Sequence, residues 1–337
     1  MKTTPISSLS ISNAMQLTVA TAQTEITKLQ TEAVTGTYSD VGLELGTRTS
    51  TSVDYNRESS RLQSIMDANS IAEQRMDASQ LAMQNMSASA QSLLNSTIAL
   101  SGNTDASSLS VAQTTATSAL ENFVSYSNTA VNGEFLFSGI NTDVQTLSDT
   151  FIKDFTKDFK DAFDLQFPNP SAVTADDMKT FLTDYQTNLD WSSWTGASEA
   201  TMSSRISTSE TVSTSTTANS DGFKNLVLAS VISSQLVNSG LNASALAVVN
   251  DTTTSLAGSA ISGIDTQRAK IGLSQERVEK ANTYMSAQKT IIDTQLTNLI
   301  GVDTYEASTR LTTLLNQVET SYKITSKIQG LSLVNYL

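Results

Sequence analysis

Residues 58–100 read ESSRLQSIMDANSIAEQRMDASQLAMQNMSASAQSLLNSTIAL, and their pattern decides the fold. Small, apolar and a few polar residues recur there at alternating spacings of three and four. These seam positions are Leu62, Ile65, Asn69, Ala72, Met76, Ser79, Met83, Met86, Ala90, Leu93, Thr97 and Leu100. The alternation is the heptad repeat of a helix that turns one side to a partner helix. At 1.5 Å per residue, the stretch predicts a single helix about 65 Å long.

The second half of the chain carries a matching heptad stretch. Its three–four spacing runs through 261–299 and stops at Gly301. Shorter helical patterns lie at 109–130, where Asn132-Gly133 is expected to end the helix, and at 223–239. Two long heptad stretches bury their apolar sides best against each other. The predicted fold is therefore mainly α, an extended antiparallel helical bundle formed by N- and C-terminal arms.

The residues between the arms have a different character. Phenylalanines recur every four residues, at Phe151, Phe155, Phe159, Phe163 and Phe167. That spacing predicts an amphipathic helix whose Phe stripe packs as core on a hairpin at 200–218. A second short helix is expected over 175–190. The region 134–222 is thus predicted to be a smaller α+β module inserted between the arms.

The two ends carry weaker stripes that Ser and Thr dilute. Gly36 breaks the first stripe, and residues 36–57 read as a polar loop. Asp303 with Glu306 forms a capping pair for a last helix, which is expected to end near Gly330. An exposed apolar C-terminus would promote aggregation, so the ends are expected to fold against neighbouring subunits. Closure of the same bundle and frayed termini are the alternatives. The residues predicted to make the packing are Met15, Val19, Ile26, Leu29, Leu311, Leu315, Val318, Tyr322, Leu331, Leu333 and Leu337.

These patterns divide the chain into five predicted segments. The boundaries fall at breaks between periodic stretches, most of which contain glycine. The segments are an N-terminal assembly segment at 1–35, an N-terminal helical arm at 36–133, a middle module at 134–222, a C-terminal helical arm at 223–303 and a C-terminal assembly segment at 304–337.

Composition excludes several classes of function. The chain has 337 residues, with 20 Lys and Arg against 33 Asp and Glu, and a formal net charge of −13. Phosphate backbones and anionic lipids would repel such a chain, which argues against nucleic-acid and membrane partners. No stretch reaches the roughly 18 apolar residues of a membrane-spanning helix. The start, residues 1–6, lacks the pattern of a cleaved signal peptide, so a cytoplasmic location is the default expectation.

Reactive groups are scarce as well. The chain contains no Cys and no His, which excludes thiolate or imidazole zinc sites and nucleophile–histidine catalytic sites. The aspartates at 158, 161, 164, 176 and 177 lack the loop spacing of a calcium site and are expected to be helix faces and caps. No cofactor or metal is therefore predicted, and the chain is not expected to be an enzyme.

Four stretches resemble the flagellin superfamily. They are LQTEAVTG at 29–36, NGEFLFSG at 132–139, GVDTYEAS at 301–308 and LSLVNYL at 331–337. The second and fourth are most similar to the family of hook–filament junction proteins. The opening lacks the Asn-Thr-Asn start and the Leu-Ser-Ser-Gly-Leu-Arg run of filament flagellins. The Phe stripe of the inserted module departs from the family's pattern.

The resemblance implies a structural subunit of the bacterial flagellum that polymerises through its terminal helices and acts as an adapter at the hook–filament junction. It implies export through the flagellar type III apparatus, without a cleaved signal, to an extracellular position. The implied partners are hook-associated protein 1, flagellin, copies of itself in a ring, and an export chaperone on the C-terminal helix. A filament flagellin and a soluble coiled-coil interaction protein are the alternatives.

Overall fold

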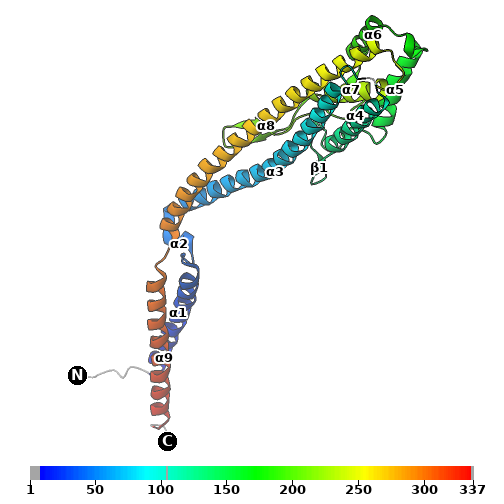
Figure 1. The fold of residues 1–337 in the computed structure, drawn as a ribbon. Helices are drawn as coiled ribbons and strands as arrows, with labels where there is room; N and C mark the ends of the chain where they lie inside the picture. Colours follow the sequence, from blue (N-terminus) through cyan, green and yellow to red (C-terminus); the bar gives the residue numbers. More distant parts are fainter. Residues whose placement is uncertain (1–7, 104, 335–337) are drawn as a thin grey trace. The chain divides into compact units, whose positions relative to one another are not determined.

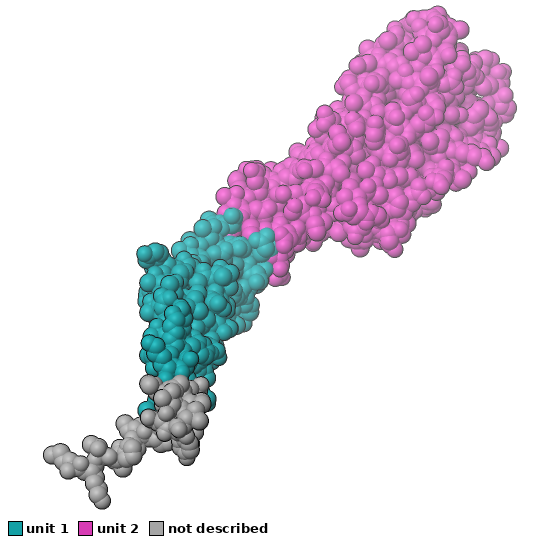
Figure 2. Space-filling view, turned by 90° about the horizontal axis from the view of Figure 1, so that it is seen from below, with its two compact units in different colours: residues 1–63, 286–337 teal, residues 64–285 magenta. Residues whose placement is uncertain are grey.

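The computed structural model describes residues 8–103 and 105–334. It divides into two units, one formed by residues 1–63 with 286–337 and the other by residues 64–285 (Figure 2). The long helices α3 (Thr49–Ala99) and α8 (Ala243–Ile300) each contribute residues to both units. The described residues are mainly α-helical, as predicted (Figure 1). The five-segment division stays a prediction.

In the first unit, α1 (Ser8–Thr35) and α9 (Thr304–Val334) lie side by side (Figure 1). Gln23 Nε2 donates a hydrogen bond to Tyr322 Oη across the pair, at 3.3 Å. Many Ser and Thr hydroxyls of these helices bond instead to the carbonyl four residues earlier, as Thr18 does to Ala14 at 2.9 Å. Such local bonding satisfies the hydroxyls within the helix, although it slightly weakens the helix itself.

The breaks after α1 and after α8 meet each other. Gly36 adopts φ +69°, a left-handed conformation that closes a helix and that glycine adopts without strain. Val302 N donates to Gly36 O at 2.9 Å, and Tyr38 N donates to Ile300 O at 3.0 Å. Thr37 and Gly301 thus form an isolated antiparallel bridge. Main-chain hydrogen bonds therefore join the segment that follows α1 to the segment that follows α8.

The expected capping at Asp303 is present. Asp303 Oδ1 accepts from Tyr305 N at 2.8 Å and from Glu306 N at 3.1 Å, which opens α9. The helix then continues through Gly330 to Val334, beyond the end that the glycine predicted. Tertiary packing and a single glycine's modest helix penalty are compatible with this continuation.

The polar loop predicted at 36–57 is wrong. Two short helices, α2 (Val41–Leu45) and η1 (Gly46–Arg48), lie in this stretch, and α3 already begins at Thr49. Asp40 Oδ1 caps α2 by accepting from Leu43 N at 2.9 Å, and Leu45 is buried. The start of α3 carries too few apolar residues to show a stripe, so periodicity alone missed it.

In the second unit, α3 and α8 run antiparallel, as predicted. Asn69 Nδ2 donates to Asn282 Oδ1 at 2.6 Å, and further along α3 Ser87 Oγ donates to Asp265 Oδ1 at 3.4 Å. The partner on α8 therefore moves backward in sequence as α3 moves forward. Paired polar residues in an apolar seam fix the register of two helices.

The core of this unit is built around α4 (Ala106–Ser127) and α7 (Asp221–Leu236), which pack on each other. The Phe223 ring lies 6.1 Å from the Phe123 ring and 5.7 Å from the Phe137 ring, measured between centroids. Most residues of α7 are buried, which matches its apolar composition.

The region predicted as an inserted module, 134–222, lies in this unit. Its helices are α5 (Phe151–Gln166), η2 (Pro170–Ala172), α6 (Ala175–Asn188) and η3 (Trp191–Ser193). Its strands are β2 (Glu134–Phe135), β3 (Ser203–Arg205) and β4 (Thr211–Ser213). β2 pairs with β1 (Ala130–Val131), which lies just before the region, and β3 pairs with β4, both antiparallel. The β3–β4 pair is the hairpin predicted at 200–218.

Two details of the module differ from the predictions. Asn132 and Gly133 were expected to end a helix, but α4 ends at Ser127 and the two residues form the β1–β2 turn with φ of 53° and 82°. Positive φ at both central residues is the reason Asn-Gly favours tight hairpins. The stripe is buried as predicted at Phe151, Phe155, Phe159 and Phe163, but the elements found against α5 are α4, α6, α7 and η3.

The aspartates of α5 and α6 serve as helix faces and caps. Thr174 and Asp177 form a capping box at the start of α6. On α5, Lys157 pairs with Asp161 and Lys160 with Asp164. Among residues 8–103 and 105–334, no group of three or more acidic side chains is placed to hold a metal ion. No helix in that part of the chain is long and apolar enough to cross a membrane.

Candidate assembly surface

The α1–α9 pair carries the residues expected to make contacts between subunits. A groove of about 500 Å³ runs between the two helices. Its lining residues are Leu17, Thr18, Val19, Thr21, Ala22, Glu25, Leu314, Gln317, Val318 and Ser321. Half of the lining residues are apolar, and Glu25 is the single charged side chain among them. Such a groove is suited to an apolar helix side rather than to a charged small molecule.

The structure places the predicted packing residues in three different environments. Leu29 is buried within the unit. Leu315 and Tyr322 are exposed, with 47% and 53% of their surface accessible. The half-buried members of the set are Met15, Val19, Ile26, Leu311 and Val318. Pairing of α1 with α9 within one chain therefore covers part of the stripe and leaves another part open.

The last three predicted residues are not placed in the same detail. Leu331 and Leu333 belong to the helical backbone of α9, and their side chains lie outside the described set. Leu337 lies outside the described residues altogether. The prediction that all of these residues pack between subunits stays a prediction.

Sequence reasoning missed several exposed apolar side chains in this unit. Leu17 is 71% exposed and lines the groove. Val34, Leu43 and Tyr305 are 87%, 76% and 82% exposed and lie close in sequence to the two breaks. These residues fall outside the heptad positions, so a search for a single apolar stripe did not select them. Exposed apolar side chains mark a contact surface where they form a contiguous patch.

A second pocket of about 420 Å³, rich in charged groups, lies where the two breaks meet. Its lining includes the carboxylates of Glu25, Glu32, Glu44, Asp303 and Glu306 and two cations, Lys28 and Arg310. Glu32 is buried, and its Oε1 accepts a hydrogen bond from Ser39 N at 3.2 Å. Lys28 Nζ donates to Glu44 Oε1 at 2.6 Å, and this contact raises the pKa of Lys28. The sequence analysis did not predict this group of carboxylates, because its residues come from three separate elements.

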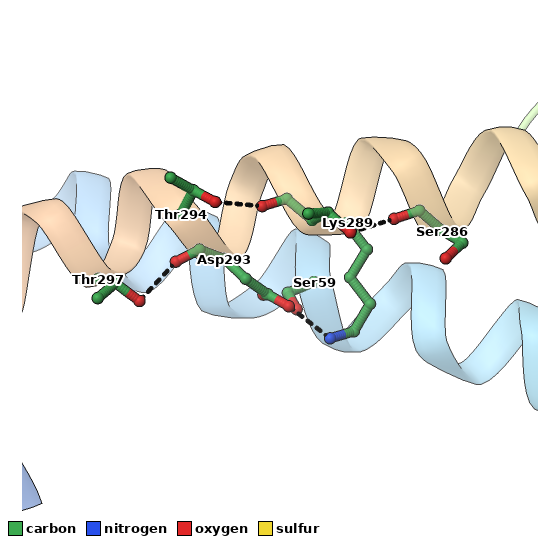
Figure 3. Close-up of polar contacts among 7 residues, drawn as sticks. Ser59, Ser286, Lys289, Asp293, Thr294 and Thr297 are labelled. Carbon is green, nitrogen blue, oxygen red and sulfur yellow. Dashed lines mark hydrogen bonds and ion pairs between the residues drawn. The ribbon is translucent and has the colours of Figure 1, made fainter.

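A polar cluster links α3 to α8 within the first unit (Figure 3). Asp293 on α8 accepts from Lys289 Nζ at 2.6 Å and from Ser59 Oγ on α3 at 2.7 Å. The Lys289 hydrogen bond, followed by the Ser59 hydrogen bond, lowers the pKa of Asp293. The carboxylate thus ties together helices from the two arms.

Comparisons with known proteins match both ends of the chain. Residues 6–142 match the family model of the bacterial flagellin N-terminal helical region, and residues 254–337 match that of the bacterial flagellin C-terminal helical region. Together the two matches cover more than half of the chain. No curated protein matches it.

Solved structures match the fold. One of them is a protein assigned as a flagellar hook-associated protein from Vibrio parahaemolyticus, which superposes with a TM-score of 0.56. The two chains are 14% identical, and the match covers 75% of this chain and 97% of the other. At that identity the likeness concerns the fold alone.

Proposed function

The chain belongs to the flagellin superfamily, whose members are structural proteins of the flagellum, and from this premise we propose that it is an adapter subunit at the hook–filament junction. Proteins of this family self-polymerise and associate with other flagellar components. The subunit would join a hook-side partner, hook-associated protein 1, to flagellin on its other side. Copies of the chain would form a ring between them.

One observation carries the junction role above the general family role. The stretch at 132–139 resembles junction proteins, and the fold likeness to a protein assigned as hook-associated is compatible with that choice. In the structure its Asn132-Gly133 turn forms a hairpin, and Glu134 pairs with Arg75 on α3. The stretch therefore docks the hairpin onto the N-terminal arm.

The proposed mechanism of assembly is geometric. The α1–α9 pair leaves Leu17, Leu315 and Tyr322 exposed. Full burial of a large apolar side chain against a neighbour contributes about 1.5–3 kcal/mol. Several such side chains per interface would hold a subunit that has no cysteine for covalent cross-links. The same surface would need cover before assembly, which is the role proposed for an export chaperone on α9 during type III export to the extracellular flagellum.

Immunogold labelling of intact flagella with an antibody against residues 140–220 tests the proposal. These residues belong mostly to the inserted module and fall almost entirely outside both matched family regions. A single band where the hook meets the filament is expected. Label along the whole filament, or none on flagella, would contradict the junction role.

The alternative of a filament flagellin also has an observation in its favour, because both matched family models describe bacterial flagellin. It differs from the junction role in copy number and position. Label along the whole filament would therefore establish it. Absence of label would favour the soluble interaction protein.

A further inference from the structure

A third groove lies in the inserted module, between α5, α6 and η3. Its volume is about 540 Å³, within the range of sites that hold a side chain or a small ligand. Its lining residues are Asp158, Ala162, Leu165, Gln166, Phe181, Asp184, Tyr185, Asn188, Leu189, Asp190, Ser193 and Trp194. Residues 158–194 lie between the two regions that match the flagellin family models. The groove therefore belongs to this chain's own insertion.

Aromatic rings that are held in place by their neighbours form one part of the lining. The Tyr185 ring lies edge-on to Phe159 at 4.9 Å, and the Trp194 ring lies edge-on to Phe155 at 5.0 Å. Both rings are half-buried, because one side of each contacts the Phe stripe. Burial, and then the hydrogen bond to Asp158, raise the pKa of Tyr185, so its hydroxyl remains a donor. The rings are thus pre-ordered surfaces on which a ligand can stack.

The charges of the groove have one sign. Asp158, Asp184 and Asp190 line it, and no Lys or Arg does. The nearby Lys157 and Lys160 are engaged with Asp161 and Asp164 of their own helix. A neutral ligand would leave these three carboxylates without a countercharge.

The carboxylates differ in how far they are already engaged. Asp158 accepts from Tyr185 Oη at 2.9 Å, and Asp190 Oδ1 accepts from Ser192 N at 3.1 Å. Among the described residues, the side chain of Asp184 makes neither a hydrogen bond nor an ion pair. An ionised carboxylate has about four acceptor positions, so all three retain capacity for a donor ligand.

We propose that this groove binds an arginine side chain presented by a basic segment of a partner protein. A guanidinium group stacks on aromatic faces and donates paired hydrogen bonds to carboxylates, which matches both components of the lining. The ammonium group of a lysine would pair with the carboxylates but would not stack on the aromatic rings as a planar guanidinium does. The inference does not depend on where in the flagellum the chain is placed.

The test is a titration of the full chain with the blocked peptide acetyl-Arg-Ala-Arg-amide at low salt, followed by calorimetry and tryptophan fluorescence. Of the two tryptophans of the chain, Trp194 lines the groove and Trp191 is buried behind it against Phe151 and Phe155, so fluorescence reports on this region. The control peptide replaces each arginine with citrulline, a neutral side chain of nearly the same shape. Saturable binding of the arginine peptide is expected, with little binding of the citrulline peptide.

Asp184→Asn is expected to weaken binding of the arginine peptide about tenfold, the loss of one charge-assisted contact. Asp154→Asn, an exposed change on α5 outside the groove, is the matched control and is expected to leave binding unchanged. Circular dichroism shows whether both variants are folded. Absent or non-saturable binding, equal binding of both peptides, or equal affinities of the two variants would overturn the proposal.

Discussion

At Gly222 and Gly263 the backbones of α7 and α8 approach each other closely. A Cβ atom built on Gly263 would lie 2.5 Å from Gly222 Cα, and one on Gly222 would lie 2.7 Å from the Gly263 carbonyl carbon. Real Cβ atoms do not approach backbone so closely, so any larger residue must push the helices apart. Because neither glycine has a side chain, α7 and α8 can pack at this short distance.

Gly263→Ala is accordingly expected to destabilise the protein by about 1–3 kcal/mol, the usual cost of overpacking. Gly258→Ala on the same helix is the matched control, because a Cβ there meets no atom within 4 Å. That change is expected to stabilise by up to about 1 kcal/mol through helix propensity. Urea unfolding followed by circular dichroism measures both. Similar effects of the two changes would contradict the close approach.

Asp293 provides a pH-dependent contact. Its pKa is lowered below the ordinary aspartate value of 3.8 by Lys289 and Ser59. A depressed folded-state pKa means that the stabilisation is complete above the unfolded value and is lost as pH falls through the folded value.

Asp293→Asn is therefore expected to lower the unfolding midpoint of the first unit at pH 7, and the difference from wild type is expected to vanish under acid conditions below the lowered pKa. Thermal unfolding between pH 7 and pH 2 measures it. Asp251→Asn, an exposed change on the same helix, serves as the control. A difference that stayed constant across this range would show that the carboxylate charge is not responsible.

At the scale of elements, helix α5 separates its two sides clearly. Phe151, Phe155, Phe159 and Phe163 are buried, whereas Leu165 on the same helix is 86% exposed. Phe159→Ala is expected to cost about 3–5 kcal/mol because it empties a packed aromatic site. Leu165→Ala is expected to change stability by less than about 0.5 kcal/mol. Denaturant midpoints of the two variants measure the contrast, and a small effect of Phe159→Ala would argue against the aromatic cluster as core.

The elements that the sequence predicted well are those with a periodic stripe. The seam from Leu62 to Leu100 became α3, and the four-residue spacing of phenylalanines became α5. The start of α3 near Thr49 was missed because an exposed polar helix shows no stripe. The ring partners of α5 were missed because contacts between separate elements are not encoded in local spacing. Asn132-Gly133 was misread because the same dipeptide both ends helices and forms hairpin turns.

The residues of the candidate assembly surface also fall into those that the sequence predicted and those that it did not. Apolar positions such as Val19 and Val318 followed from the stripe, and both line the α1–α9 groove. The carboxylate-rich pocket did not follow, because Glu32, Glu44 and Glu306 belong to three separate elements that the fold brings together near Gly301. Tertiary crossings of this kind leave no period in a sequence.

At the scale of the whole molecule, removal of residues 304–337 is expected to separate folding from assembly. The deletion removes α9 and uncovers α1, whereas the unit of residues 64–285 has its own core. The truncated chain is expected to remain a soluble monomer by analytical ultracentrifugation and to be absent from flagella. Its unchanged incorporation would show that α9 is not needed for contacts between subunits.

The hydroxyl groups along α1 and α9 have a consequence for desolvation. Thr18, Thr309, Thr313 and Thr320 each donate to the carbonyl four residues earlier in their own helix, at 2.8 to 2.9 Å. A polar group without a partner loses free energy when a neighbouring protein displaces its water, but a hydroxyl that is already hydrogen-bonded loses much less. Packing of neighbouring helices against α1 and α9 would therefore cost little free energy at these hydroxyls. In the free subunit the same hydroxyls keep the helix surfaces polar.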